Sequence, residues 1–274
     1  MIRRPFLAAA IQMTSVPSLE GSLNQAEALV HQAASRGAEL IGLPENLPQI
    51  GETQEEAAAQ VPTTFPRAEE WLSDLARQLG VVLYGGVIAP GGDRRVRNLL
   101  VVAGRTGEVI ATYQKRHLFD VAIGDRATFQ ESATVEPGRE PVVADLGDLG
   151  KLGLSICYDL RFPEHYRALV DLGAELLTVP AAFLTVTGQD HWHVLLRARA
   201  IENTCYLLAP AQGGRHNSRR ESYGHALVVD PWGNVLADTG NRVGVAIAEI
   251  DPARLAEVRT QLPCLEHRRD RLPV

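Results

Sequence analysis

The chain has 274 residues, of which 45% are hydrophobic and 22% charged, a composition typical of a soluble globular protein with a substantial core. Its net charge of -6 disfavours nucleic-acid binding, and no stretch approaches the roughly 20 apolar residues that a membrane helix needs. The three cysteines, Cys157, Cys205 and Cys264, have unrelated spacings. They predict neither a disulfide framework nor a zinc site, and they favour a cytoplasmic location.

The first part of the chain predicts alternating strands and helices. An apolar run at 6–13 indicates a buried strand, and apolar residues recur at helical spacing over 22–36, with Ser22 as the N-cap and Gly37 as the stop. The other elements predicted here are a strand at 40–43, a helix at 66–79, a strand at 81–87, and a hairpin of strands 96–103 and 108–113 around a turn at 104–107.

The remaining sequence continues this alternation. Residues 119–140 lack a regular pattern and predict a long functional loop. The predicted strands that follow are 151–156, 176–179, 206–211, 226–230, 235–238 and 243–250, and the predicted helices are 163–172, 190–204 and 252–261. Because no linker or repeat divides the series, we expect an α/β protein with a single domain over residues 1–274.

Polar residues stand where several predicted strands end, the edge at which α/β sheets place their chemistry. Glu45 follows the second predicted strand, Lys115 follows the hairpin, and Cys157 follows the strand predicted at 151–156. Glu131 lies in the predicted loop. Taken singly, each has a simpler interpretation, since charged strand ends are commonly solvated and unpaired cysteines are commonly buried apolar residues.

Taken together, these residue types predict an acyl-transfer site. A thiol facing the amino end of a helix, here one starting near Pro163, lies where backbone N–H groups favour its thiolate. A neighbouring carboxylate can move the thiol proton, and a lysine can stabilise the charge of the tetrahedral intermediate. The thiol then forms a thioester that water hydrolyses, and no metal or organic cofactor is required.

Three segments that contain these residues resemble the nitrilase superfamily of carbon-nitrogen hydrolases. They are 43–46 (Leu-Pro-Glu-Asn), 113–120 (Tyr-Gln-Lys-Arg-His-Leu-Phe-Asp) and 156–164 (Ile-Cys-Tyr-Asp-Leu-Arg-Phe-Pro-Glu). The resemblance implies a four-layer α-β-β-α sandwich, usually paired into homodimers. It also implies that Glu45 is the general base, Lys115 the stabilising cation, Cys157 the nucleophile and Glu131 a second carboxylate, with the backbone N–H of Tyr158 in the oxyanion hole.

Further segments are similar to the branch that contains ω-amidases and deaminated glutathione amidases. They are 179–183, 187–192, 195–203 and 223–225, while 211–216 and 264–269 favour the second type. This resemblance implies hydrolysis of the γ-amide of deaminated glutathione to 2-oxoglutarate and cysteinylglycine, a metabolite-repair reaction. An ω-amidase acting on 2-oxoglutaramate and a small-amide hydrolase of broader range are the alternatives.

A substrate with carboxylates at both ends calls for cations near the thiol. Arg215, His216, Arg219 and Arg220 form a basic segment that suits this role, although the same segment is also compatible with a solvated turn. The other substrate-binding candidates are Tyr158, Phe183 and Thr187. An aromatic residue such as Phe183 either walls a pocket or packs in the core.

The remaining predictions concern partners. His191 and His193 flank Trp192, but no carboxylate-rich cluster accompanies them along the sequence, so we predict no metal. The expected partner is a small-molecule amide, without nucleic acid or membrane. A silent binding protein on the same scaffold is disfavoured because all three triad residues are present. A nucleotide-binding protein is disfavoured because 12–17 carries no glycine-rich fingerprint.

Overall fold

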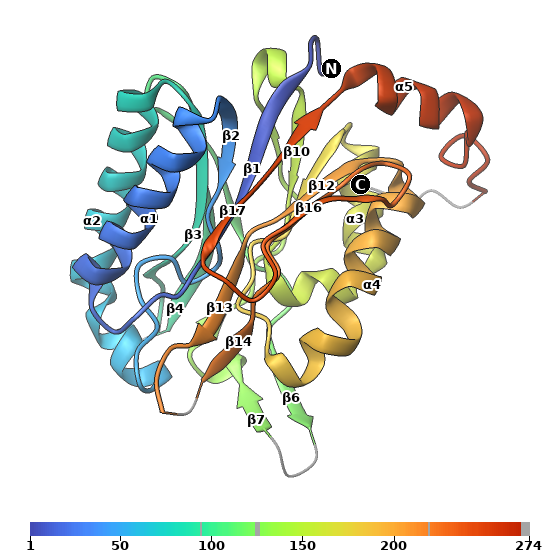
Figure 1. Cartoon of the computed structure of the whole chain (residues 1–274). Helices are drawn as coiled ribbons and strands as arrows, with labels where there is room; N and C mark the ends of the chain where they lie inside the picture. The colour runs from blue at the N-terminus through green and yellow to red at the C-terminus, as the bar shows by residue number, and fades with distance from the viewer. Residues whose placement is uncertain (94, 124–126, 219, 270–274) are drawn as a thin grey trace.

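The computed structural model describes residues 1–93, 95–123, 127–218 and 220–269. Two sheets lie face to face, and helices cover the outer side of each (Figure 1). The helices α1 (Leu19–Ser35) and α2 (Gln54–Leu79) cover one sheet, while α3 (Pro163–Asp171) and α4 (Thr185–Asn203) cover the other. This arrangement confirms the expected four-layer α-β-β-α sandwich.

The first sheet has nine strands, in the order β14-β13-β1-β2-β3-β4-β5, with β17 also paired to β1 and β8 to β4. Strands β1, β2 and β3 run parallel. The bounds are β1 (Phe6–Met13), β2 (Ala38–Gly42), β3 (Val82–Pro90), β4 (Val96–Ala103), β5 (Val109–Gln114), β8 (Val135–Glu136), β13 (Ala211–Arg215), β14 (Glu221–Tyr223) and β17 (Gly244–Ile250).

The second sheet has six strands, in the order β16-β15-β12-β11-β10-β9, of which β10, β11 and β12 run parallel. The bounds are β9 (Val143–Asp145), β10 (Lys151–Leu154), β11 (Leu176–Thr178), β12 (Tyr206–Ala209), β15 (Leu227–Val229) and β16 (Val235–Asp238). After β17, the last regular element of the described residues is α5 (Pro252–Gln261), which extends beyond the sandwich (Figure 1).

The alternation of side chains along β1 explains why the sheet is covered on both faces. Ala8 and Ala10 belong to the apolar cluster between the sheets, whereas Ala9 and Ile11 pack in the cluster formed with α1 and α2. Successive residues of a strand point to opposite faces, so a continuous apolar run is what a doubly covered strand requires. Small alanines on the inner face allow the two sheets to approach closely.

The start of α1 differs from the sequence expectation. The N-cap is Ser18, whose hydroxyl accepts a hydrogen bond from the amide of Gly21 at 3.2 Å. Ser22 lies inside the helix, is buried, and accepts a hydrogen bond from the backbone N–H of Val16 at 3.0 Å. Both serines precede apolar residues at helical spacing, so only the backbone conformation distinguishes the cap.

The second helix is longer than predicted, because α2 begins at residue 54 rather than at Pro66. Thr53 caps it by accepting the amide of Glu56, and Pro62 and Pro66 lie inside the helix. Prolines favour the first turn, which is why Pro66 suggested a start. Here Val61 is buried between β4 and β8, and this packing holds the extra turns in place despite the missing backbone donors.

The predicted loop at 119–140 contains regular structure. It forms a two-stranded ribbon of β6 (Asp120–Ile123) and β7 (Ala127–Gln130), a 3-10 turn η1 (Glu131–Ala133) and β8. Residues 124–126 of this predicted functional loop lie outside the described residues. Strands β9, β13 and β14 were not predicted, and α4 begins at Thr185, five residues before the predicted start at 190. Within the described ranges, none of the helices has the length and apolar character needed to span a bilayer.

Candidate active site

Four residues that the sequence singled out meet at one end of the sandwich. Glu45 follows β2, Lys115 follows β5, Glu131 begins η1, and Cys157 begins the 3-10 turn η3 (Cys157–Arg161) after β10. All four are buried, with exposed fractions of 2–9%. They also line the same cavity, so elements of both sheets and the β6–β7 ribbon contribute to a single site.

The ammonium group of Lys115 lies between two carboxylates. Its Nζ is 2.9 Å from Glu45 Oε1 and 2.9 Å from Glu131 Oε2. Asn98 Nδ2, from β4, donates to Glu45 Oε1 at 2.9 Å. The second oxygen of Glu45 accepts the backbone N–H of Ala182 at 3.0 Å. Glu45 is therefore held in one orientation by three donors, which is the fixed geometry that a proton-transfer group requires.

The position of Cys157 is set by its backbone. Its φ is +48°, a left-handed conformation that is uncommon for a residue with a side chain. Its N–H donates to the carbonyl of Pro180 at 2.9 Å, which ties η3 to the loop after β11. Tyr158 follows in the first turn of η3, where amides lack partners within the helix and are available to a ligand.

The charges of the site follow from burial and from neighbours. Burial acts to raise the pKa of Glu45, but the charge of Lys115 and its hydrogen bond outweigh burial and hold that pKa below its usual value. Burial acts to lower the pKa of Lys115, and the charges of Glu131 and Glu45 raise it well above normal. The site thus holds an ionised Glu45 carboxylate beside a charged lysine.

The thiol behaves differently from the sequence expectation. Burial and the negative charge of Glu45 raise the pKa of Cys157 well above its usual value, although Lys115 acts in the opposite direction. The short turn η3 therefore does not make Cys157 a thiolate in the free protein. A neutral thiol beside an ionised carboxylate needs that carboxylate to take its proton when the sulfur attacks.

Asp159 joins the turn that carries Cys157 to the segment that carries Lys115. Its carboxylate accepts hydrogen bonds from the backbone N–H of Ile156 at 2.8 Å, from the hydroxyl of Tyr113 at 2.7 Å and from the backbone N–H of His117 at 3.1 Å. The ring of His117 also contacts it at 2.7 Å. This buried acid thereby fixes the relative placement of nucleophile and lysine.

The cavity at the site has a volume of about 470 Å3. Tyr158, Phe183 and Thr187, predicted as substrate-binding residues, all line it. Phe183 combines both interpretations considered for it, because it is buried against Trp192, with ring centroids 5.1 Å apart, and also forms part of the cavity wall.

Two of the predicted substrate-binding residues do not line the cavity. Arg215 is exposed at the end of β13, where its guanidinium pairs with Glu221 at 3.6 Å. His216 is buried, with Nδ1 2.9 Å from the carbonyl of Ser15 and Nε2 2.8 Å from Ser222 Oγ. Burial lowers the pKa of His216 to about 4, so it is neutral at physiological pH and is a poor ligand for a carboxylate.

Among the described residues of this basic segment, Arg220 is the arginine that lines the cavity. Arg219 lies outside the described residues. The positive charge of Arg220 also lowers the pKa of Glu45. Its Nε atom is buried and has no hydrogen-bond partner among the described residues. A buried N–H of this kind can donate a hydrogen bond to a carboxylate oxygen of a ligand without a competing internal bond to break.

Two donors to Glu45, the side chain of Asn98 and the backbone amide of Ala182, were not predicted from the sequence. An amide side chain inside the apolar strand 96–103 is unusual, and this was the available signal for Asn98. The amide of Ala182 carries no side-chain signal at all. It reaches Glu45 because the loop after β11 passes over the end of β2.

The geometry supports nucleophilic attack assisted by a base. The Glu45 carboxylate can take the proton of the Cys157 thiol, and Lys115 can stabilise negative charge that develops on an attacked carbonyl. Glu131 is bonded to Lys115 through both oxygens, at 3.0 and 2.9 Å, which suits a positioning role.

Comparison with known proteins places this geometry in context. The sequence profile of the family described as "Carbon-nitrogen hydrolase" matches residues 7–260. A deaminated glutathione amidase of Synechocystis sp. is 50% identical over 269 residues, which cover 97% of this chain and 98% of that protein. The protein of the same name from Bos taurus is 43% identical over 268 residues, covering 96% and 82% of the two chains. The crystal structure of the C. elegans NitFhit protein matches with a TM-score of 0.92 at 38% identity, and the match covers 98% of this chain but 66% of that longer one.

Proposed function

Because this chain belongs to the carbon-nitrogen hydrolase family, we propose that it hydrolyses the γ-amide bond of deaminated glutathione and releases 2-oxoglutarate and cysteinylglycine. The buried cluster of Glu45, Lys115 and Glu131 around the Cys157 thiol carries the reaction class. The choice of substrate is supported by the name of the Synechocystis relative at 50% identity.

The first half-reaction acylates the enzyme. Cys157 Sγ attacks the carbonyl carbon of the amide while its proton passes to Glu45. The oxyanion that forms is stabilised by the ammonium of Lys115 and by the backbone N–H of Tyr158. Glu45 then gives the proton to the departing amine of cysteinylglycine, and the C–N bond breaks to leave a thioester on Cys157.

The second half-reaction returns the free enzyme. Water attacks the thioester carbonyl and loses a proton to Glu45, and the same cation and amide stabilise the second oxyanion. The C–S bond breaks, Cys157 leaves as the thiol with the proton from Glu45, and 2-oxoglutarate is released. This cycle uses no redox partner and no group outside the chain.

The position of Arg220 favours a substrate that carries negative charge. It adds a positive charge to the cavity wall, and its buried Nε offers a donor. Deaminated glutathione carries carboxylates at both ends, and pairing one of them with a guanidinium would hold the scissile amide beside Cys157. The assignment of this role to Arg220 replaces the earlier expectation for Arg215 and His216.

The alternative within the same reaction class is an ω-amidase, which a direct comparison of substrates tests. We expect kcat/KM for deaminated glutathione to exceed that for 2-oxoglutaramate, because the cavity has room for the dipeptide leaving group. Initial rates for both amides, with Cys157→Ala as the inactive control, measure this. A preference for 2-oxoglutaramate would overturn the substrate, and full activity of Cys157→Ala would overturn the covalent mechanism.

Three further features belong to this proposal. We assign the enzyme to metabolite repair, because its substrate would be a side product that the reaction returns to two usable metabolites. The three free cysteines, Cys157, Cys205 and Cys264, suit a reducing cytoplasm. A homodimer through the helical layer is supported by exposed apolar side chains on α4, considered further below.

A further inference from the structure

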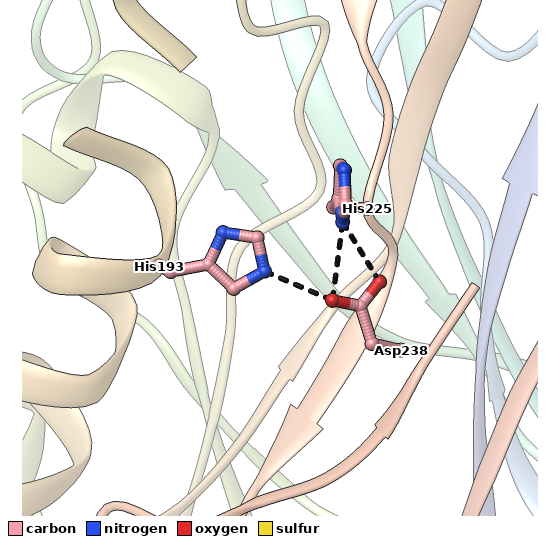
Figure 2. A group of neighbouring side chains, drawn as sticks. All are labelled: His193, His225 and Asp238. Carbon is pink, nitrogen blue, oxygen red and sulfur yellow. Dashed lines mark hydrogen bonds and ion pairs between the residues drawn. The ribbon is translucent and has the colours of Figure 1, made fainter. Parts of the chain in front are cut away.

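Two histidines and an aspartate come together outside the active-site cavity. His193 lies on α4, His225 lies between β14 and β15, and Asp238 ends β16 (Figure 2). His193 Nε2 is 2.9 Å from Asp238 Oδ2, and His225 Nδ1 is 3.1 Å from each oxygen of Asp238. None of the three lines the cavity at Cys157.

His225 is held in its position by the backbone on both sides. Its φ is +57°, a left-handed conformation that costs energy for a histidine. Its N–H donates to the carbonyl of Gly240 at 3.0 Å, and its own carbonyl accepts the indole N–H of Trp192 at 2.9 Å. Its ring stacks on Tyr223, with centroids 4.6 Å apart. The ring is thus presented to Asp238 in one orientation.

The other two side chains are also constrained. Asp238 Oδ1 accepts the backbone N–H of Gly240 at 2.7 Å, which orients the carboxylate. The ring of His193 lies edge-on to that of His225, at 4.9 Å between centroids, and the nitrogens of both rings point to the same carboxylate (Figure 2). The side chains are 21–33% exposed, so an ion from solvent can reach them.

We propose that His193 Nε2, His225 Nδ1 and the Asp238 carboxylate bind a divalent transition-metal ion of the zinc type. One candidate ligand atom from each residue lies within 4.8 Å of the others. Tetrahedral zinc bonds of about 2.0–2.2 Å to nitrogen and oxygen place neighbouring ligand atoms roughly 3.3–3.6 Å apart, so the histidine–aspartate separations of 2.9 and 3.1 Å would open by a few tenths of an ångström. The two histidine nitrogens lie within 4.8 Å of each other and would move closer together to bind one ion.

The donor set also selects the ion. Imidazole suits Zn²⁺ and its neighbours in the transition series, whereas Ca²⁺ and Mg²⁺ require mainly oxygen ligands. With both imidazoles neutral, the single carboxylate leaves one negative charge to attract a cation. Three protein ligands leave a fourth position for water or an exogenous ligand.

This proposal departs from the expectation of no metal. The sequence presented His191 and His193 around Trp192 without a carboxylate partner, and the tertiary structure supplies Asp238, which is 45 residues along the chain from His193. His191 takes no part in the group, since its Nδ1 faces Arg161 instead. The second histidine of the group is His225.

An ion here would join α4 to the strands beside it. The first turn of α4 carries Thr187 of the cavity wall, and β14 is tied to that wall because the N–H of Tyr223 donates to the carbonyl of Phe183 at 2.8 Å. The ion would therefore stabilise one wall of the cavity without contacting the thiol. Its role is structural and does not depend on the identity of the amide substrate.

The test is to add Zn²⁺ to metal-free protein, to measure binding by calorimetry, and to measure the midpoint of thermal unfolding with and without the ion. We expect one ion per chain and a higher midpoint with Zn²⁺. His193→Gln and Asp238→Asn, which keep side-chain size, should each weaken binding about tenfold or more and remove the rise in midpoint. His191→Gln, the same substitution on the same helix, should bind as the unsubstituted protein does.

Cysteine is the main competing ligand for zinc, so Cys157→Ala and Cys264→Ser are measured in parallel. Binding that persists in both supports the site. Co²⁺ in place of Zn²⁺ should give weak visible bands without the intense near-ultraviolet band of thiolate ligation. The proposal is overturned if no Zn²⁺ binds at micromolar concentration or if Asp238→Asn binds Zn²⁺ as tightly as the unsubstituted protein does. Loss of Zn²⁺ binding in Cys157→Ala or in Cys264→Ser would also overturn it.

Discussion

Lys115 has both a structural and a chemical part in the site. Two buried carboxylates contact its ammonium group at 2.9 Å, and without that charge they would repel each other in a poorly solvated environment. The ammonium group can also stabilise an oxyanion, provided that the two carboxylates leave one of its N–H groups free to face the substrate. Glu131, bonded through both oxygens, determines where Lys115 Nζ points and is therefore a positioning residue.

Replacing Glu131 with glutamine tests that role. Burial lowers the pKa of Lys115 and the charge of Glu131 opposes this, so Glu131→Gln should lower that pKa and move the basic limb of the kcat/KM profile to lower pH. We expect kcat to fall by less than the roughly 10²–10³-fold effect of losing an oxyanion donor, with little change in KM. Glu136→Gln, on β8 outside the cavity, is the control. A reduced rate with an unshifted basic limb would contradict the positioning role.

At the scale of elements, one buried acid connects two segments that have to meet. The turn η3 bears the nucleophile, and the segment after β5 bears the lysine. Asp159 bonds to the backbone of the first at Ile156 and to Tyr113 and His117 of the second. Burial acts to raise the pKa of Asp159, but the hydrogen bond from His117 and the other donors hold it below its usual value.

This connection predicts a pH-dependent loss of stability in Asp159→Asn. Since the pKa of Asp159 is lowered in the folded state, its contribution is present above its unfolded pKa of about 3.9 and disappears as pH falls through the folded value. At pH 7 the free energy of unfolding should fall by about 1.5–3 kcal/mol, and the difference should shrink below about pH 4. Chemical denaturation at several pH values measures this.

The control for this measurement is Tyr113→Phe, which removes one donor to Asp159 and keeps the carboxylate. It should cost about 0.5–1.5 kcal/mol at pH 7. An Asp159→Asn deficit of equal size at pH 7 and pH 3 would show that the charge of Asp159 contributes nothing to stability.

At the scale of the whole molecule, the outer helical layer is the surface that suits self-association. Val194 is 66% exposed and Ile201 is 44% exposed on α4. These residues are seven apart and lie on the same side of the helix, away from the buried Trp192 and Leu196. Exposed apolar side chains on one helix face are more consistent with a protein interface than with free solvent.

We therefore expect Val194→Asp to weaken the proposed homodimer. A charge placed in an apolar interface loses its hydration and finds no partner, so the dimer dissociation constant should rise by about tenfold or more. Sedimentation velocity over a range of concentrations measures this. Val109→Asp, on the partly exposed start of β5, is the matched control. A monomer in the unsubstituted protein, or an unchanged dimer in Val194→Asp, would reject this interface.

Much of the fold could be predicted because the apolar patterns are local. The strand 6–13 and the helix 252–261 have the predicted bounds, since a continuous apolar run and a proline-started helix are visible in sequence alone. The start of α2 could not be predicted, because contacts of Val61 with β4 and β8 override the signal of Pro66. The ribbon β6–β7 was missed because short strands without a buried face carry little pattern.

The sequence by itself determined the residue types of the site and their order along the chain, because Glu45, Lys115 and Cys157 each follow a recognisable element and Glu131 lies in the long loop after the hairpin. The tertiary structure decided which neighbours act on them. Arg220 lines the cavity, whereas Arg215 pairs with Glu221 at the exposed end of β13, a difference that follows from the path of the chain between the two strands. The thiol is neutral because burial, a property of the whole fold, outweighs the charge of one nearby lysine.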